Sequence, residues 1–140
     1  MTKNLLRTIK EIDYWRKFSN SEIHFVPTMG NLHQGHQRLI EEASRYKNKS
    51  TLVSIFINPL QFNNKKDFNS YPKTIKKDIE IAFSSGADAI FIPKNNEIFP
   101  ENEVNIKLIE ASKHLTSNLC GATREGHFNG VCTVVHRLLN

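Results

Sequence analysis

The sequence predicts an α/β protein whose parallel sheet is covered by helices on both faces. Three short apolar segments, residues 22–26, 51–57 and 88–92, predict strands, and segments with helical periodicity separate them. The middle segment is an almost unbroken apolar, β-branched run, which is typical of a strand buried on both faces of a parallel sheet. Strands and helices that alternate in this way form right-handed βαβ units. Ligands of such sheets bind beyond the carboxyl ends of the strands, so we expect the site there.

The first half of the chain holds two predicted helices. Apolar residues at every third position predict a helix over residues 9–18, and Asn20 and Ser21 should end it. Pro27 should stop the ladder of the strand that follows. A second helix is expected from His33 or Gly35 to about Tyr46, closed by Asn48. Its core face should consist of three apolar residues: Leu39, Ile40 and Ala43.

The second half alternates polar and apolar segments. Pro72 precedes a predicted helix over residues 75–83 that Gly86 should end, and Pro93 should stop the third strand. Weaker patterns predict a series of shorter elements. In order, these are a loop at 63–71, a helical turn at 97–100, an exposed edge strand at 104–108, a short helix at 112–119, a glycine-bearing loop at 121–130 and a last helix at 128–139.

Composition limits the classes of function. The 140 residues are 39% apolar and 24% charged, as in globular proteins, and 19 basic against 14 acidic residues give a net charge of +5. This charge favours small anionic ligands over nucleic acid, because the basic residues are scattered. Without a signal peptide or a membrane-length apolar run, we expect a cytoplasmic protein with no membrane partner. Cys120 and Cys132 match neither a CxxC pair nor a disulfide framework, so both thiols should be structural.

The main candidate site is a strand, a glycine-bearing loop and a helix start at residues 25–36. A helix N-terminus carries unpaired N–H groups and partial positive charge, so with His33 and His36 it should bind an anion such as a nucleotide phosphate. Gly35 allows a close backbone approach. Two surface histidines, or a zinc site completed by His127, are the alternatives.

Three further candidates follow from residue type and position. Asn58 and Gln61 come directly after the buried middle strand, and their carboxamides suit a substrate with hydroxyl and carboxylate groups, although Asn58-Pro59 is also ordinary turn chemistry. Arg124 and His127 precede the last apolar helix and combine a cation with a helix N-terminus, or form an ordinary basic loop. Asp78 is either a ligand for a phosphate-bound metal or a solvated helix acid.

These segments together resemble the pantothenate synthetases, also called pantoate–β-alanine ligases (AMP-forming), within the HIGH-type nucleotidyltransferases. The resemblance covers about residues 20–140. Four segments match in order: FVPTMGNLHQGH at 25–36, SIFINPLQF at 54–62, YPKT at 71–74 and LCGATREGHFNGV at 119–131. The HxGH element alone is shared with many nucleotidyltransferases, so the combination carries the resemblance.

The resemblance implies a Rossmann-like fold and a two-step reaction. ATP and pantoate would give pantoyl adenylate and pyrophosphate, and the amine of β-alanine would then displace AMP. It implies that His36 acts as an acid with His33 beside it. Two sets of binding residues are implied. ATP would contact Met29, Gly30, Asn31, Leu32, His33, Gln34, Gly35 and His36, and pantoate and β-alanine would contact Gln61, Asn58, Met29, Arg124 and His127.

The resemblance also implies Mg²⁺, a homodimer and further chain. Asp78 is the candidate magnesium ligand, although Lys77 stands where some family members carry an acid. The alternating segment at 104–108 is a candidate dimer seam. Residues 1–140 are expected to be the amino-terminal nucleotide-binding domain of a longer enzyme, because they contain no Gly-x-Lys-Asp segment and no lid domain. A nucleotidyltransferase with the same HxGH loop, or a module that binds ATP or pantoate without turnover, remains open.

Overall fold

The computed structural model describes residues 3–19, 21–118 and 120–140. The chain forms two compact units. Unit 1 contains Met1–Phe56 and Pro72–Glu97, and unit 2 contains Ile57–Tyr71 and Ile98–Asn140. The expected end of the first helix at Asn20 lies outside the described residues.

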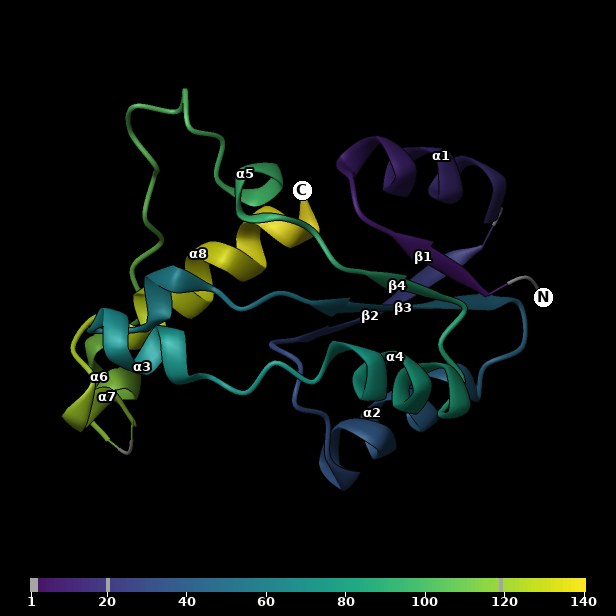
Figure 1. The fold of residues 1–140 in the computed structure, drawn as a ribbon, viewed down its shortest axis with the longest axis horizontal. Coiled ribbons are helices and arrows are strands. Elements are labelled where there is room, and N and C mark those ends of the chain that lie inside the picture. The colour runs from purple at the N-terminus through teal and green to yellow at the C-terminus, as the bar shows by residue number, and fades with distance from the viewer. Residues whose placement is uncertain (1–2, 20, 119) are drawn as a thin grey trace. The chain divides into compact units, whose positions relative to one another are not determined.

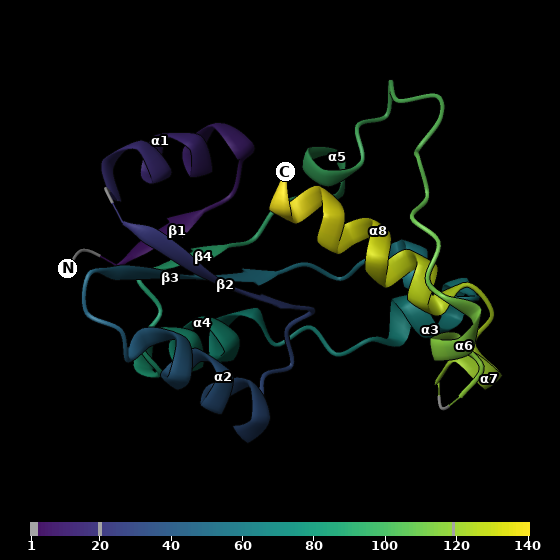
Figure 2. The same cartoon turned by 180° about the vertical axis from the view of Figure 1, so that it is seen from behind.

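Unit 1 is built on a parallel four-stranded sheet, which confirms the predicted class. The strands are β1 (Asn4–Leu6), β2 (Glu22–Thr28), β3 (Lys49–Ile55) and β4 (Ala89–Phe91), in the order β1-β4-β3-β2. Helix α1 (Ile9–Ser19) lies on one face, and α2 (Gln34–Ser44) and α4 (Ile75–Ser84) lie on the other (Figures 1 and 2). β1 was not predicted, because its three residues are too few for a periodic pattern and pair only with the distant β4.

The core of unit 1 lies between the sheet and helices α2 and α4. Ile40, Val53 and Ile90 are fully buried in it. Leu39 was predicted to share this face but is 60% exposed, because one residue along a helix turns a side chain by about 100°. α1 forms as predicted, but Phe18 is 69% exposed and stacks on Tyr14 with 4.6 Å between ring centroids.

Pro27 does not stop its ladder, so this prediction was wrong. Pro27 pairs in register with Ser54, and the next residue, Thr28, accepts a backbone hydrogen bond from Phe56 at 3.0 Å. The backbone N–H and C=O groups of alternate residues in a parallel strand point to opposite sides. Because the C=O of Thr28 points toward β3, the position where Pro27 lacks an N–H lies on the other side of β2. β2 stands at the edge of the described sheet, where proline is tolerated.

Two turns of unit 1 lie where the sequence predicted them. Gly86 ends α4 with φ of +111°, and the next residue, Ala87, donates to the carbonyl of Ala82 at 3.0 Å. Asn48 takes φ of +67° in the turn before β3, although α2 itself already ends at Ser44.

Unit 2 is mostly helical. Its elements are η1 (Pro59–Gln61), α3 (Lys65–Ser70), α6 (Lys113–Thr116), α7 (Cys120–Thr123) and α8 (His127–Leu139). The boundary between the units falls within α5 (Asn95–Ile98), where a helical turn was expected slightly later. α8 confirms the predicted last helix, and α6 is shorter than predicted.

Three predictions for unit 2 were wrong. Residues 63–71 contain α3, whose first turn is capped by Asn64 through a 2.8 Å hydrogen bond from the Asp67 amide. Residues 104–108 form no strand: Val104 is 91% exposed, and no described strand pairs with this segment. Residues 121–130 hold most of α7 and the first turn of α8 rather than a loop.

Among the described residues, no helix combines the length and apolarity that crossing a bilayer requires.

Candidate functional site

The loop of residues 29–33, here called the rim loop, joins β2 to α2 in unit 1. Gly30 and Asn31 take φ angles of +79° and +52°. A Cβ at Gly30 would lie 2.9 Å from Oδ2 of Asp78 and 3.1 Å from Cγ2 of Ile55. Glycine is therefore required here both by backbone conformation and by space.

Asp78 holds the rim loop from α4, 46 residues further along the chain. Its Oδ1 accepts the N–H of Leu32 at 2.8 Å, and its Oδ2 accepts the N–H of Asn31 at 2.9 Å. The hydroxyl of Thr74 also donates to Oδ2, at 3.0 Å. The carboxylate is 1% exposed, and these three donors offset the cost of burying its charge.

The two imidazoles cap α2 through reciprocal hydrogen bonds. Nδ1 of His33 accepts the N–H of Gly35 at 3.0 Å, and Nδ1 of His36 accepts the N–H of His33 at 3.3 Å. The ring centroids are 4.1 Å apart. Since an accepting Nδ1 is unprotonated, each neutral ring carries its proton on Nε2.

This arrangement changes the expected mode of anion binding. The N–H groups of Gly30 to His33, directly before the helix start that the sequence predicted to bind an anion, are already bonded. Gly30 donates to Oγ1 of Thr28 at 3.1 Å, and the next three N–H groups bond to Asp78 and His36. The Nε2–H groups of His33 and His36 have no partner among the described residues and can donate to a ligand. Nothing in the apolar pattern indicated Thr28 or Thr74 as supports of this loop.

His36 is half-buried, and its pKa lies below the ordinary value of 6.5. Burial lowers this pKa most, the charge of neighbouring His33 lowers it further, and Asp78 opposes both. Around neutral pH the ring is therefore neutral and keeps its place in the cap.

The lowered pKa predicts acid-sensitive stability for unit 1. Between the folded-state pKa of His36 and about 6.5 the unfolded chain binds more protons, so the free energy of unfolding should fall as pH drops through that window. Urea unfolding between pH 7.5 and 5, with NMR titration of the His36 ring, measures this. A His36→Gln variant should lose that part of the pH dependence. A His36 pKa at or above 6.5 in the folded protein contradicts the assignment.

The described side chains do not fit a protein-held metal ion. Both oxygens of Asp78 face hydrogen-bond donors in a buried setting, so neither offers an open position to Mg²⁺. His33 and His36 use Nδ1 in the cap. No group of three histidine, cysteine, aspartate or glutamate side chains in the described residues is placed to bind a metal, so the zinc alternative gains no support.

Unit 2 brings together three of the predicted substrate residues. Nδ2 of Asn58 donates to Oε1 of Gln61 at 3.0 Å and to the carbonyl of Gly130 at 2.9 Å, while its Oδ1 accepts the N–H of Leu60 at 3.2 Å. Nδ1 of His127 lies 2.9 Å from the carbonyl of Gln61. These bonds tie η1 to α8.

The predicted substrate residues of unit 2 differ in what they leave free. Asn58 is fully buried with its amide nitrogen and oxygen bonded, so its role in this arrangement is to position Gln61. The amide nitrogen of Gln61 has no partner among the described residues. The guanidinium of Arg124 is exposed and likewise has none in the described ranges, although the Arg124 carbonyl accepts the N–H of His127 at 3.1 Å.

Gly130 is a supporting residue that sequence reasoning missed. A Cβ there would lie 2.4 Å from the carbonyl oxygen of Leu60, so only glycine allows α8 to pass this close to η1. A glycine inside an apolar helical pattern was the available signal. His33 and His36 lie in unit 1, while Gln61, Arg124 and His127 lie in unit 2.

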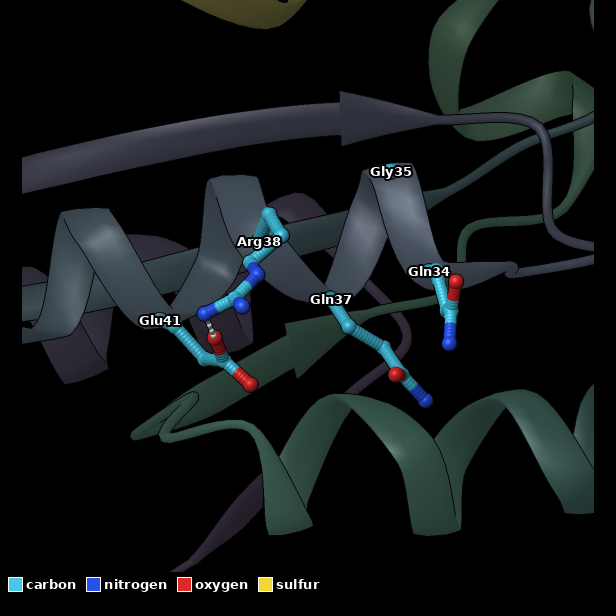
Figure 3. A pocket seen from close by; sticks show the side chains of 5 residues that line it. All are labelled: Gln34, Gly35, Gln37, Arg38 and Glu41. Atoms are coloured by element: carbon cyan, nitrogen blue, oxygen red, sulfur yellow. Dashed lines mark hydrogen bonds and ion pairs between the residues drawn. The ribbon is translucent and has the colours of Figure 1, made fainter.

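An open hollow of about 400 Å³ runs along the exposed side of α2. Gln34, Gly35, Gln37, Arg38 and Glu41 line it, and Arg38 pairs with Glu41 at 3.1 Å (Figure 3). The hollow begins at the first turn of the helix, but neither imidazole lines it. The hollow is therefore a polar surface that includes Gln34 and Gly35, and it does not enclose the Nε2–H groups of His33 and His36.

The chain is similar throughout to proteins of one family. The sequence profile of the family described as pantoate-beta-alanine ligase matches residues 4–140. A bifunctional pantoate ligase/cytidylate kinase of Prochlorococcus marinus strain MIT 9301 is 59% identical over 140 residues, which is 100% of this chain and 28% of the relative. The chain thus spans little more than a quarter of the length of such curated relatives.

Solved structures agree with the sequence comparison. Pantothenate synthetase from Thermus thermophilus matches with a TM-score of 0.85 and 37% identity, over 97% of this chain and 48% of that one. Pantoate-beta-alanine ligase from Francisella tularensis, complexed with beta-gamma ATP and beta-alanine, matches with a TM-score of 0.87 and 39% identity, over 99% of this chain and 52% of that one.

Proposed function

The chain belongs to the pantoate-beta-alanine ligase family, with its Rossmann-like nucleotide-binding fold, and from this premise we propose that the whole protein joins pantoate to β-alanine at the expense of ATP. The observation that carries the proposal is the reciprocal cap of His33 and His36, which leaves two Nε2–H donors at a strand end. Only the ligase half of the curated relatives' name is carried over, because the matching family profile describes a ligase alone.

We propose that these donors bind phosphate oxygens of ATP. In the first step the pantoate carboxylate attacks the α-phosphorus, and pyrophosphate leaves. Negative charge on the phosphate oxygens needs fixed donors most in the transition state, and preorganised imidazole N–H groups supply them. The lowered pKa and the accepting Nδ1 favour His36 as a neutral donor rather than as the acid that the resemblance implied.

For the second substrate we propose a binding role for unit 2. The free N–H groups of the Gln61 amide suit a carboxylate or a hydroxyl, and the unpaired guanidinium of Arg124 suits a carboxylate. His127 contributes by fixing the carbonyl of Gln61. Asn58 supports Gln61 from behind. The β-alanine amine would then attack the pantoyl adenylate and release AMP.

The remaining features are proposed from the family alone. We propose that residues 1–140 supply the nucleotide-binding part of the enzyme, and that the protein is a cytoplasmic homodimer. Mg²⁺ would enter with the phosphates of ATP, since the described side chains offer it no open position. The dimer seam suggested at residues 104–108 has no support, because that segment forms no strand in the described residues.

A coupled assay tests the function. The full protein, given ATP, pantoate and β-alanine, should release pyrophosphate only with pantoate and AMP only when β-alanine is added. A stable nucleotide-linked product with no AMP would select the nucleotidyltransferase alternative. ATP binding by calorimetry without any turnover would select the binding module. Either of these two results rejects the proposed ligase reaction.

Replacing Gln61 with alanine should affect pantoate more than ATP. Loss of its N–H donors is expected to raise KM for pantoate about tenfold, which is the effect of about one hydrogen bond to a charged group, with KM for ATP unchanged. Steady-state kinetics with each substrate varied in turn measure the two constants. Gln37→Ala removes a half-buried carboxamide that lines the hollow along α2 and should change neither constant. Equal losses for both substrates would contradict the assignment.

A further inference from the structure

Asp78 is the most completely buried acidic side chain of unit 1, and the reaction proposed above does not use it. It is 1% exposed and stands in the first turn of α4. Its two oxygens accept the consecutive N–H groups of Asn31 and Leu32 at 2.9 and 2.8 Å, one oxygen to each. One carboxylate that spans two neighbouring amides fixes the direction of the backbone between them.

We propose that Asp78 is a positioning residue for nucleotide binding, and that it acts by holding the rim loop rather than by ligating magnesium. The inference rests on the proposed function, because it takes the Nε2–H groups of His33 and His36 as the nucleotide donors. In this role the Asp78 carboxylate holds the backbone of the rim loop, which neither its charge nor its position on α4 indicated.

The path from Asp78 to the imidazoles is short and continuous. Leu32, whose N–H bonds to Oδ1, is followed directly by His33, and the N–H of His33 bonds to Nδ1 of His36. A shift of the loop backbone therefore moves the donor that fixes the His36 ring. Gly30 lies against the same carboxylate, because a Cβ there would be 2.9 Å from Oδ2.

A magnesium role would require Asp78 to give up these bonds. Its carboxylate already accepts three hydrogen bonds within 3.0 Å, and turning an oxygen toward a metal would leave a buried N–H of the loop without an acceptor. The anchoring role requires no such rearrangement. The two roles differ in one measurable way, which is whether loss of Asp78 matters when no metal is present.

The test compares ATP binding by Asp78→Asn with and without Mg²⁺. Asparagine keeps the shape but presents an amide NH₂ to one of the two loop donors. We expect ATP affinity to fall about tenfold or more, to the same extent in excess Mg²⁺ and in EDTA, with KM for pantoate unchanged. NMR signals of the His33 and His36 rings should also move in the variant before any nucleotide is added. A loss confined to the magnesium samples, or unmoved ring signals, would overturn the proposal.

Two further variants guard against a general folding defect. Asp88→Asn makes the same change to another carboxylate, whose Oδ2 accepts the Thr51 N–H at 2.8 Å at the other end of β3, and it should leave ATP affinity unchanged. If both aspartate variants lower ATP affinity alike, the specific role of Asp78 is rejected. Gly30→Ala keeps the carboxylate but forces it off the loop, so it should also lower ATP affinity about tenfold or more. This variant tests the same contact if Asp78→Asn fails to fold. Wild-type affinity in Gly30→Ala would also reject the role.

The same samples separate this inference from the proposed function. Failure of the wild-type protein to bind ATP would reject the nucleotide site itself. The ring signals of His33 and His36 in Asp78→Asn would still decide whether Asp78 holds the rim loop.

Discussion

Replacing His36 with alanine is expected to lower pantoate-dependent pyrophosphate release by about 10²- to 10³-fold, the cost of removing one preorganised donor to a developing oxyanion. The variant loses the Nε2–H donor and also the acceptor for the His33 N–H, so His33 loses part of its support. The core of unit 1 should persist, because His36 is half-buried and contributes nothing to the cluster around Ile40 and Val53. Single-turnover assays with excess enzyme measure the chemical step directly.

A second histidine provides the control. His114, an exposed residue of α6, should tolerate alanine without any change in rate. Circular dichroism and urea unfolding should show that both variants remain folded. Pyrophosphate release by folded His36→Ala at the wild-type rate would remove His36 from the mechanism.

Replacing Gly130 with alanine is expected to lower the free energy of unfolding of unit 2 by about 3 kcal/mol, the upper part of the usual range for overpacking. The new methyl group would lie 2.4 Å from the carbonyl oxygen of Leu60 and 2.7 Å from the amide nitrogen of Gln61. These are backbone atoms, which cannot rotate aside as a flexible side chain can. Urea denaturation followed through unit 2 probes measures the loss.

The matched control for this change is Gly126→Asn. Gly126 has φ of +73°, a conformation that asparagine tolerates, and no atom lies within 4 Å of a Cβ placed there. Its unfolding free energy should therefore stay near that of the wild type. In Gly130→Ala the bond between Asn58 and the Gly130 carbonyl should also weaken, which would raise KM for pantoate. A stability change below about 0.5 kcal/mol, the size of ordinary surface substitutions, would show that α8 can yield at this point.

The strands that could be predicted from the sequence are those with a local run of apolar residues. β3 and β4 are apolar segments that are buried almost throughout, so composition alone indicates them, and β2 is indicated by its shorter apolar segment. β1 exists only because three residues meet β4 more than 80 positions away, and no local pattern encodes that pairing. Residues 104–108 show the opposite case. Their alternating apolar pattern predicts a strand, but a strand forms only where another strand pairs with it. In α3 a single capping residue, Asn64, outweighs the polar composition that suggested a loop.

The sequence predicted where a site could lie, but it did not predict which residues support that segment. The histidine spacing identified the rim loop, because a strand, a glycine and a helix start are adjacent in the chain. The support from Asp78 comes from 46 residues away, and its role depends on which atoms face the loop. In the same way, Asn58 and Gln61 are three residues apart in the sequence, yet only the bonds of Asn58 to Gln61 and to the Gly130 carbonyl show that Asn58 is a buried support.

Proline at position 27 has a consequence for what can pair beside β2. A strand at the border of a sheet can recruit a strand from a neighbouring molecule, and this is a common route to fibrils. Along the outer side of β2 in the described sheet, the exposed Pro27 has no N–H to donate, so a strand that pairs there would meet an interruption. Pro27 therefore limits which backbone hydrogen bonds any further strand can make along this side of β2, whether that strand belongs to the same protein or to another copy.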